Sequence, residues 1–274
     1  MNENYNHIIK LFKEKYLKDI SVFQNVFIEL TLKSRMTETK QTNLYNYIDL
    51  INKDKKEALD FFNALKNTYT EFFRNPLTFG FLENILLPKI LNKDETINTG
   101  LRIWSAGCSS GEESYSLLML FYDFINIHSL SFDINIFATD NSTIMIEKAK
   151  KGLFNKNNVK NIKIDYINKY FDLTTDCYLI KDFIKKYINF SQYDLLEEES
   201  NSPPESIYGD FDLIMCCNLL LYYNWENQKK IIEKFYSSLK TDKYLIVGEV
   251  EIGIIKRSKL FYQIAEYVPI FIKA

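Results

Sequence analysis

The sequence predicts an α/β fold in which a mostly parallel, doubly wound sheet follows a helical N-terminal region. Two observations lead to this prediction. Up to about residue 92, apolar residues recur at the three- and four-residue spacing of amphipathic helices. After Asn98-Thr99-Gly100, short apolar segments typical of buried strands alternate with segments of helical periodicity. This alternation is typical of strands that are joined by crossover helices and run parallel in one sheet.

The composition is that of an ordinary globular protein, with 46% hydrophobic and 26% charged residues. Lys and Arg number 34 against 36 Asp and Glu, so the net charge of -2 argues against a nucleic-acid partner. No run of 18 apolar residues occurs and the first residues are polar. We therefore expect a cytoplasmic protein with no direct membrane insertion. The four cysteines form no CxxC pair and there are two histidines, so spacing predicts no metal site.

The N-terminal region contains several apolar stripes, each with the period of a helix. They are Ile8, Ile9, Leu11, Phe12 and Tyr16; Val22, Val26, Phe27 and Leu30; Leu44, Tyr47, Ile48 and Ile51; and Ala58, Leu59, Phe62 and Leu65. Asn75-Pro76 is a helix-start signal, and a further helix is expected from Leu77 to Leu91. We place an N-terminal helical domain at residues 1–92 and the α/β domain at residues 93–274.

The α/β region contains four segments with the character of buried strands, and helical segments lie between them. Strands are expected at Leu101–Ala106, Ile134–Thr139, Phe211–Cys216 and Tyr244–Gly248, and helices at Glu112–Ile127, Ser142–Lys151 and Trp225–Leu239. Ser142 is a candidate N-cap and Gly152 a candidate C-terminal stop. Residues 155–193 interrupt the alternation and are expected to form a small inserted β-subdomain, with strand-like pieces at Tyr178–Ile180 and Ile188–Phe190. Residues 197–208 are expected to form a polar surface loop.

A glycine-bearing turn between the first strand and its helix is the first candidate site. Gly107 and Gly111 flank this turn, and Glu113 follows in the first helical turn. Glycine allows a ligand to approach the backbone at the carboxyl end of the sheet. The spacing is neither GxGxxG nor a P-loop, and Glu113 would accept hydrogen bonds from a ligand ammonium group rather than bind phosphate. An ordinary strand-to-helix turn is the alternative.

Acidic and amide side chains follow three later strands. Asp140 ends the second strand, where an acid commonly accepts hydrogen bonds from ribose hydroxyls, although it could instead cap the next helix. Asp194-Leu195 and Asn218-Leu219 follow other strands at the same edge, as residues of a cleft or of solvated turns. Arg74 lies beside Phe72-Phe73 and needs an anionic partner, either in a ligand or in a surface ion pair.

Five blocks of sequence occur in a specific order. They are TEFFRNPLTFGFLENILLP, LRIWSAGCSSGEESYSLLML, IFATDNSTIMIEKAKKGLF, INKYF, and FDLIMCCNLLLYYNWENQKKIIEKFYSSL with YLIVGEVE. In this order the blocks resemble those of the CheR family, the chemotaxis protein methyltransferases of bacterial signal transduction. The resemblance covers about residues 60–274. It implies a Rossmann-like class I methyltransferase domain with an N-terminal all-helical domain and a small inserted β-subdomain.

The resemblance also implies an activity and a site. The cofactor would be S-adenosylmethionine, the product S-adenosylhomocysteine, and the acceptors glutamate side chains in the cytoplasmic domains of membrane chemoreceptors. The implied cofactor contacts fall on Thr68, Thr70, Arg74, Gly107, Glu113, Asp140, Asp194, Leu195, Asn218 and Leu219, and the implied catalytic residues are Arg74 and Tyr222. Within this set, Glu113 would bind the amino group of the cofactor and Asp140 its ribose.

Three positions depart from the family pattern. The family usually has Asn at Thr68, Asn at Asp194 and Arg at Cys217. The short segment between Phe171 and Tyr178 lacks the glycine-bearing loop with which some relatives grip a receptor C-terminal pentapeptide, so a pentapeptide tether is not expected. Two alternatives remain: a non-catalytic module that binds the cofactor or a receptor, and a methylase of nucleic acids or small molecules. The absence of an Asn-Pro-Pro-aromatic motif argues against a nucleic-acid amino methylase.

Overall fold

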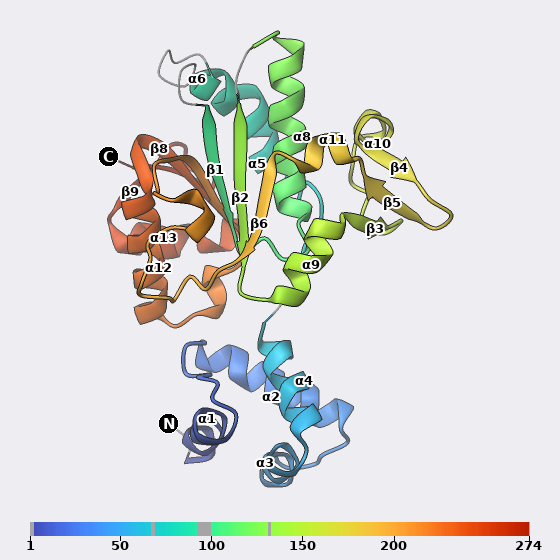
Figure 1. Ribbon diagram of the computed structural model, residues 1–274. Coiled ribbons are helices and arrows are strands. Elements are labelled where there is room, and N and C mark those ends of the chain that lie inside the picture. Colours follow the sequence, from blue (N-terminus) through green and yellow to red (C-terminus); the bar gives the residue numbers. More distant parts are fainter. Residues whose placement is uncertain (1–2, 67–68, 92–99, 131–132, 274) are drawn as a thin grey trace. The chain divides into compact units, whose positions relative to one another are not determined.

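The structure is a computed structural model that describes residues 3–66, 69–91, 100–130 and 133–273 (Figure 1). Contacts within the chain group it into two compact units. The first is Met1–Thr68 with Leu221–Gln228, and the second is Tyr69–Leu220 with Lys229–Ala274. The predicted domain boundary near residue 92 stays a prediction. Within the described part of the chain, no helix is both long and apolar enough to cross a membrane.

The first unit is helical, as the sequence predicts. Its helices are α1 (Glu3–Lys15), α2 (Asn25–Glu38), α3 (Leu44–Lys53) and α4 (Lys55–Leu65). The Asn43 side chain caps α3 and the Asp54 side chain caps α4, so each helix begins at a residue that satisfies its first amide groups. Their buried residues include Ile8, Phe12, Ile28, Leu32, Tyr47, Ile51, Phe61 and Leu65.

The predicted buried stripe of α2 is wrong. Val26 and Leu30 are 60% and 56% exposed, whereas Ile28 and Leu32 are buried. Apolar residues occur on several sides of this helix, so periodicity alone could not choose the buried face.

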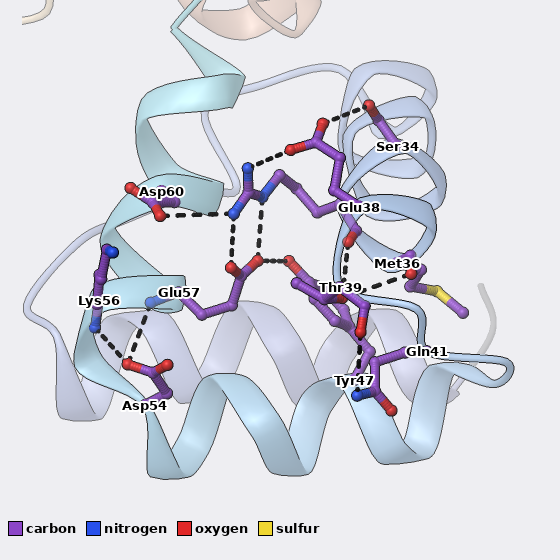
Figure 2. A network of polar contacts seen from close by, with 11 residues as sticks. Ser34, Met36, Glu38, Thr39, Gln41, Tyr47, Asp54, Lys56, Glu57 and Asp60 are labelled. Carbon is purple, nitrogen blue, oxygen red and sulfur yellow. Dashed lines mark hydrogen bonds and ion pairs between the residues drawn. The ribbon is translucent and has the colours of Figure 1, made fainter.

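A buried ion pair joins three helices of the first unit (Figure 2). Arg35 of α2 forms a bidentate pair with Glu57 of α4, from Nε at 3.0 Å and from a terminal nitrogen at 2.5 Å. The hydroxyl of Tyr47 on α3 donates to the same carboxylate at 2.7 Å. Glu38 and Asp60 add further acidic contacts to Arg35, at 2.6 and 3.5 Å. Glu57 is 6% exposed, so the network fixes the three helices around a desolvated charge.

Residues 221–228 lie within the first unit although they are distant from its helices in sequence. The backbone N–H of Gln24 donates to the carbonyl of Tyr222 at 2.8 Å, and the Gln24 side-chain amide donates to the carbonyl of Leu221. The Phe23 and Tyr223 rings stack at 5.7 Å, and the Phe27 ring meets the Tyr222 ring edge-on at 4.6 Å. The helical unit is therefore built partly on a segment from the C-terminal half of the chain.

A seven-stranded sheet forms the centre of the second unit. Its strands are β1 (Leu101–Ala106), β2 (Ile134–Asp140), β6 (Ile188–Gln192), β7 (Phe211–Cys216), β8 (Leu239–Val247), β9 (Phe261–Gln263) and β10 (Ile270–Lys273). They lie in the order β6-β2-β1-β7-β8-β10-β9; the first five run parallel, and β10 is antiparallel to both of its neighbours. This arrangement confirms the predicted α/β class with a mostly parallel, doubly wound sheet.

Helices cover both faces of the sheet (Figure 1). They are α8 (Glu112–Ile127) and α9 (Thr143–Lys151) on one face and α12 (Trp225–Ser238) on the other, with α5 (Pro76–Phe81), the π-helical turn Leu82–Leu86, α6 (Leu87–Leu91) and α13 (Ile252–Ser258) around them. Successive side chains of β1 point to opposite faces of the sheet, so a layer of helices packs on each face. Ile103 joins the core under α8, whereas Trp104 points the other way and meets Phe235 of α12 at 5.3 Å.

The inserted β-subdomain follows α9. It contains β3 (Leu153–Asn155), α10 (Ile164–Tyr170), β4 (Phe171–Leu173), β5 (Cys177–Ile180) and α11 (Asp182–Lys185), with the antiparallel strand order β3-β5-β4. Of the two strand-like pieces expected in this region, Tyr178–Ile180 lies in this small sheet. The other, Ile188–Phe190, lies in β6 of the central sheet, where it pairs with β2.

Candidate functional site

The candidate site lies where the strand order of the central sheet reverses. β1 and β7 are neighbours in the sheet, and the chain leaves them in opposite directions, towards β2 and towards β8. Such a switch point leaves a crevice at the carboxyl ends of the strands. Gly107 follows β1 with φ of +80°, and a Cβ there would lie 2.8 Å from Cδ2 of Leu219, which follows β7. The structure therefore brings together Gly107 and Leu219, and a side chain at residue 107 would require the Leu219 methyl group to shift and would be strained by the positive φ.

Glu113 lies in the first turn of α8, beside this turn. The Ser105 hydroxyl donates to its carboxylate at 2.8 Å, and the Ser114 hydroxyl donates to Ser105 at 3.0 Å. Burial raises the pKa of Glu113 to about 7, and the charge of Glu251 adds to the effect, while the hydrogen bond from Ser105 opposes it. A ligand cation beside Glu113 would favour its ionised form.

The surroundings of Glu113 have a negative potential. Burial raises the pKa of the Cys108 thiol, and the charges of Asp140 and Glu113 raise it further. Burial likewise raises the pKa of the Cys217 thiol, with Glu113 and Glu251 as the next causes. Three carboxylates therefore act on one small region, which suits a cationic ligand. Among the residues that the structure describes, no cluster of His, Cys, Asp or Glu could hold a metal ion.

Asn218 is held by Glu251, which ends the block YLIVGEVE but was not among the predicted site residues. One carboxylate oxygen of Glu251 accepts from the backbone N–H of Asn218 at 2.9 Å and from that of Gly248 at 2.7 Å. Glu251 is fully buried, and Asn218 has the left-handed φ of 58°. Its Oδ1 is buried with no hydrogen-bond partner among the described residues. The signal in the sequence was an acid in the segment after a strand-ending glycine, but spacing could not show that it reaches Asn218.

Asp140 joins the ends of two loops. Its Oδ2 accepts from the backbone N–H of Ser109 at 3.0 Å, and its Oδ1 accepts from that of Ser142 at 2.8 Å. The cap of α9 is Ser142, as predicted, since its hydroxyl accepts from Met145 N–H. Asp140 thus fixes the glycine-bearing turn after β1. A carboxylate has about four lone-pair sites, so these two bonds are compatible with a further bond from a ribose hydroxyl.

The two backbone hydrogen bonds of Asp140, together with the ribose contact expected from the sequence, lead to a prediction. Replacing Asp140 with Ala should weaken binding of S-adenosylhomocysteine about 10- to 100-fold, the cost of a charge-assisted hydrogen bond. It should also destabilise the fold by about 1–3 kcal/mol, because the amides of Ser109 and Ser142 lose their acceptor. Calorimetry and thermal circular dichroism measure the two effects. Asp140→Asn, which keeps one carbonyl acceptor, is the control and should lose less stability; unchanged affinity in both variants would contradict the ribose role.

The loop after β6 reaches the same edge of the sheet. The backbone N–H of Tyr193 donates to the carbonyl of Asp140 at 3.0 Å. Leu195 is buried, whereas the Asp194 side chain is exposed and accepts from Leu196 N–H at 2.9 Å. The predicted pair Asp194-Leu195 therefore directly follows a residue that is hydrogen-bonded to Asp140, and its apolar member, Leu195, is buried.

Arg74 lies on a loop that is anchored to α8. The backbone N–H of Phe73 donates to the Ser116 hydroxyl at 2.9 Å, and Phe73 and Asn75 both have positive φ, at 50° and 63°. The guanidinium lies 5.5 Å from the centre of the Tyr69 ring and donates to the Tyr69 carbonyl at 3.3 Å. Backbone strain of this kind occurs at sites where a side chain must be held in one orientation.

The predicted site residues also include Thr70, Thr68 and Tyr222. Thr70 lies on the same loop as Arg74, in the second unit. Thr68 lies outside the described residues. Tyr222 belongs to the first unit, where its ring packs on Phe27.

These residues fit a positively charged nucleoside cofactor. The carboxylates of Glu113, Asp140 and Glu251 supply a negative potential, and the buried Oδ1 of Asn218 could accept a hydrogen bond from a ligand. The glycine turn lies at the switch point of the sheet. Fold and site together define a Rossmann-like methyltransferase domain that uses S-adenosylmethionine.

Comparison with known proteins gives the family. The sequence profile described as "CheR methyltransferase, SAM binding domain" matches residues 68–266. The chain belongs to the CheR methyltransferase family.

Relatives of similar length carry consistent names. The "Chemotaxis protein methyltransferase" of Borreliella burgdorferi is 30% identical over 91% of this chain and 88% of its own length. "Chemotaxis protein methyltransferase 2" of Vibrio cholerae is 30% identical, over 88% of this chain and 83% of its own. The "Chemotaxis protein methyltransferase" of Escherichia coli is 27% identical, over 80% and 74%. The family resemblance that the sequence blocks suggested is confirmed.

Proposed function

We propose that this protein transfers a methyl group from S-adenosylmethionine to glutamate side chains of membrane chemoreceptors. The products would be glutamyl methyl esters and S-adenosylhomocysteine, and the reaction would serve chemotactic adaptation. The observation that carries the proposal is the buried Glu113 carboxylate beside the glycine-bearing turn at the switch point, in a chain of the CheR methyltransferase family. The names of the relatives supply the link to chemotaxis.

The proposed chemistry makes modest demands on the protein. A glutamate side chain in water has a pKa of about 4.3, so the acceptor is ionised at neutral pH and needs no general base. When bound, the cofactor supplies an activated methyl group and a neutral leaving group. The protein must align the two reactants and exclude water, and alignment can lower the barrier by about 7–11 kcal/mol at best.

Each site residue then receives a role. Glu113 would bind the cofactor's amino group and Asp140 its ribose, while Thr70 and Arg74 would lie at its methionine end. The pairs Asp194-Leu195 and Asn218-Leu219 would flank its adenine and sulfonium region, beside Gly107. Arg74 would orient the acceptor carboxylate or the cofactor carboxylate, and Tyr222 would shape the pocket near the acceptor.

Arg74 provides a test of catalysis as distinct from binding. If it acts in the transition state, Arg74→Ala should lower turnover by more than it lowers cofactor affinity. Arg74→Lys keeps the charge but loses the planar guanidinium, so it should recover affinity more fully than turnover. Steady-state kinetics and calorimetry measure the two quantities. An equal loss of both would instead assign Arg74 to cofactor binding.

A non-catalytic binding module of the same fold is the second candidate. Cys217 stands where the family usually has Arg, and its thiol lies beside Glu113 rather than supplying a positive charge. We favour the enzyme, because the similar proteins of Borreliella burgdorferi, Vibrio cholerae and Escherichia coli are named chemotaxis protein methyltransferases. Glu113, Asp140 and Asn218 would serve cofactor binding in either candidate. We also propose that receptor binding is independent of a C-terminal pentapeptide, since only Thr174–Asp176 joins β4 to β5.

Transfer of a radiolabelled methyl group to membranes that contain the host's chemoreceptors tests the proposed function. Label on receptor-sized bands that alkali releases as methanol is the expected result, because carboxyl methyl esters are base-labile. Absence of such label, with S-adenosylmethionine still bound in calorimetry, would contradict catalysis and favour the binding module.

A further inference from the structure

A buried lysine on α12 has no part in the chemistry described above. Lys234 is 6% exposed, which is rare for lysine unless polar groups pair with its ammonium. Its Nζ donates to the Tyr193 hydroxyl at 2.8 Å and to the Glu197 carbonyl at 2.5 Å. An aliphatic side chain could replace neither bond.

The two partners of Lys234 flank the loop that follows β6. Tyr193 precedes Asp194-Leu195, and Glu197 closes the turn, since its N–H donates to the Asp194 carbonyl at 3.0 Å. The ammonium group therefore holds both ends of a short loop that carries two of the proposed cofactor contacts. Without it, one end would lose a hydroxyl contact and the other a carbonyl contact.

Tyr193 connects this lysine to the site. Its ring lies 6.0 Å from the Trp104 ring of β1, and its N–H donates to the Asp140 carbonyl. Its hydroxyl donates to the Ser200 carbonyl at 2.6 Å, and the Lys234 ammonium lies 4.9 Å from the centre of its ring. The position of Tyr193 is thus fixed from both sides, by the sheet and by α12.

The charges around Lys234 are negative, so they favour its protonated form. Burial lowers the pKa of Lys234, while the carboxylates of Glu197, Asp194 and Glu198 act in the opposite direction. The acidic residues around Lys234 therefore belong to the loop after β6, the loop that its hydrogen bonds hold.

We propose that Lys234 is a positioning residue for the adenosine end of the cofactor, acting by holding residues 193–197 in their binding conformation. This inference rests on the proposed roles of Asp194 and Leu195. Lys234 does not touch the reacting atoms; it raises the fraction of molecules whose loop is ready to bind. Apparent affinity scales with that fraction.

Two ligands and two variants test this role. Lys234→Met should weaken both S-adenosylhomocysteine and 5′-methylthioadenosine by about tenfold, because the second ligand keeps the adenosine but lacks the amino acid end. At saturating cofactor, turnover should stay near that of the wild type while KM for the cofactor rises. The matched control is Lys230→Met, one turn earlier on α12, which removes the exposed Lys230–Glu198 pair at 2.9 Å and should leave both affinities unchanged.

The outcomes separate this inference from the proposed function. A lysine with a merely structural role would lower the melting temperature of Lys234→Met and leave both affinities within twofold of the wild type, which would overturn the positioning role alone. If Lys234→Met fails to fold, Tyr193→Phe removes only the hydroxyl partner and should weaken both ligands severalfold; unchanged binding would overturn the proposal. Wild-type protein that binds neither ligand would overturn the proposed function and this inference together.

Discussion

Cofactor affinity should fall about tenfold for each pH unit below about pH 7, because binding needs an ionised Glu113 whose pKa burial raises to about 7. Below that value the free protein holds a proton that the ligand's ammonium must displace. At a higher pH the ligand's own amino group loses its charge; its pKa lies above the roughly 7.7–8.0 of a peptide α-amino group, because a free carboxylate is next to it. We therefore expect a bell-shaped profile of affinity with its maximum between these values, measured by calorimetry with S-adenosylhomocysteine.

Glu113→Gln separates this explanation from other sources of pH dependence. The variant should bind about 10- to 100-fold more weakly at the optimum, as expected for loss of a charged hydrogen-bond partner. It should also lose the acid limb of the profile. The matched control is Glu112→Gln, at the preceding position of α8, where burial also raises the pKa of the carboxyl. An acid limb that persists in Glu113→Gln and disappears in Glu112→Gln would contradict the assignment.

Arg35→Met should destabilise the helical unit by about 3–5 kcal/mol, since it leaves the buried carboxylate of Glu57 without its cation. Hydrogen exchange of the amides in α2, α3 and α4 measures this locally in the full chain. The control is Lys53→Met, which breaks an exposed pair with Asp49 and should cost less than about 1 kcal/mol.

A double variant shows how much of this loss of stability comes from the uncompensated charge of Glu57. Arg35→Met combined with Glu57→Met removes both charges, so stability should recover most of the difference. Loss of protection in the double variant as large as in Arg35→Met would show that the effect comes from packing or from Tyr47 rather than from the buried charge.

The sequence allowed the centre of the fold to be predicted because its signals there are local. β1, β7 and α8 have the predicted bounds, since long apolar segments end at glycine or at a change of period. The strands β9 and β10, of three and four residues, were missed because so short a segment has no measurable alternation. They form only by pairing with each other and with β8.

In the candidate site, too, some contacts could be predicted from the sequence and others could not. Gly107 and Leu219 could be expected at one edge, because the carboxyl ends of neighbouring parallel strands meet there. The bond from Asn218 to Glu251 spans 33 residues, and the bonds from Lys234 to the loop after β6 join elements that no motif relates. Contacts of this kind depend on side-chain packing in three dimensions and leave no periodic trace in the sequence.

The segment Leu221–Gln228 has a consequence for how the protein can be dissected. It packs on Phe23, Gln24 and Phe27, yet the chain on either side of it belongs to the methyltransferase unit. A fragment that starts at Tyr69 would keep this segment and lose every helix on which it folds, which would expose the aromatic rings of Tyr222 and Tyr223. The helical unit is therefore not a detachable module, and in evolution the two units could be exchanged between relatives only together with this short internal piece.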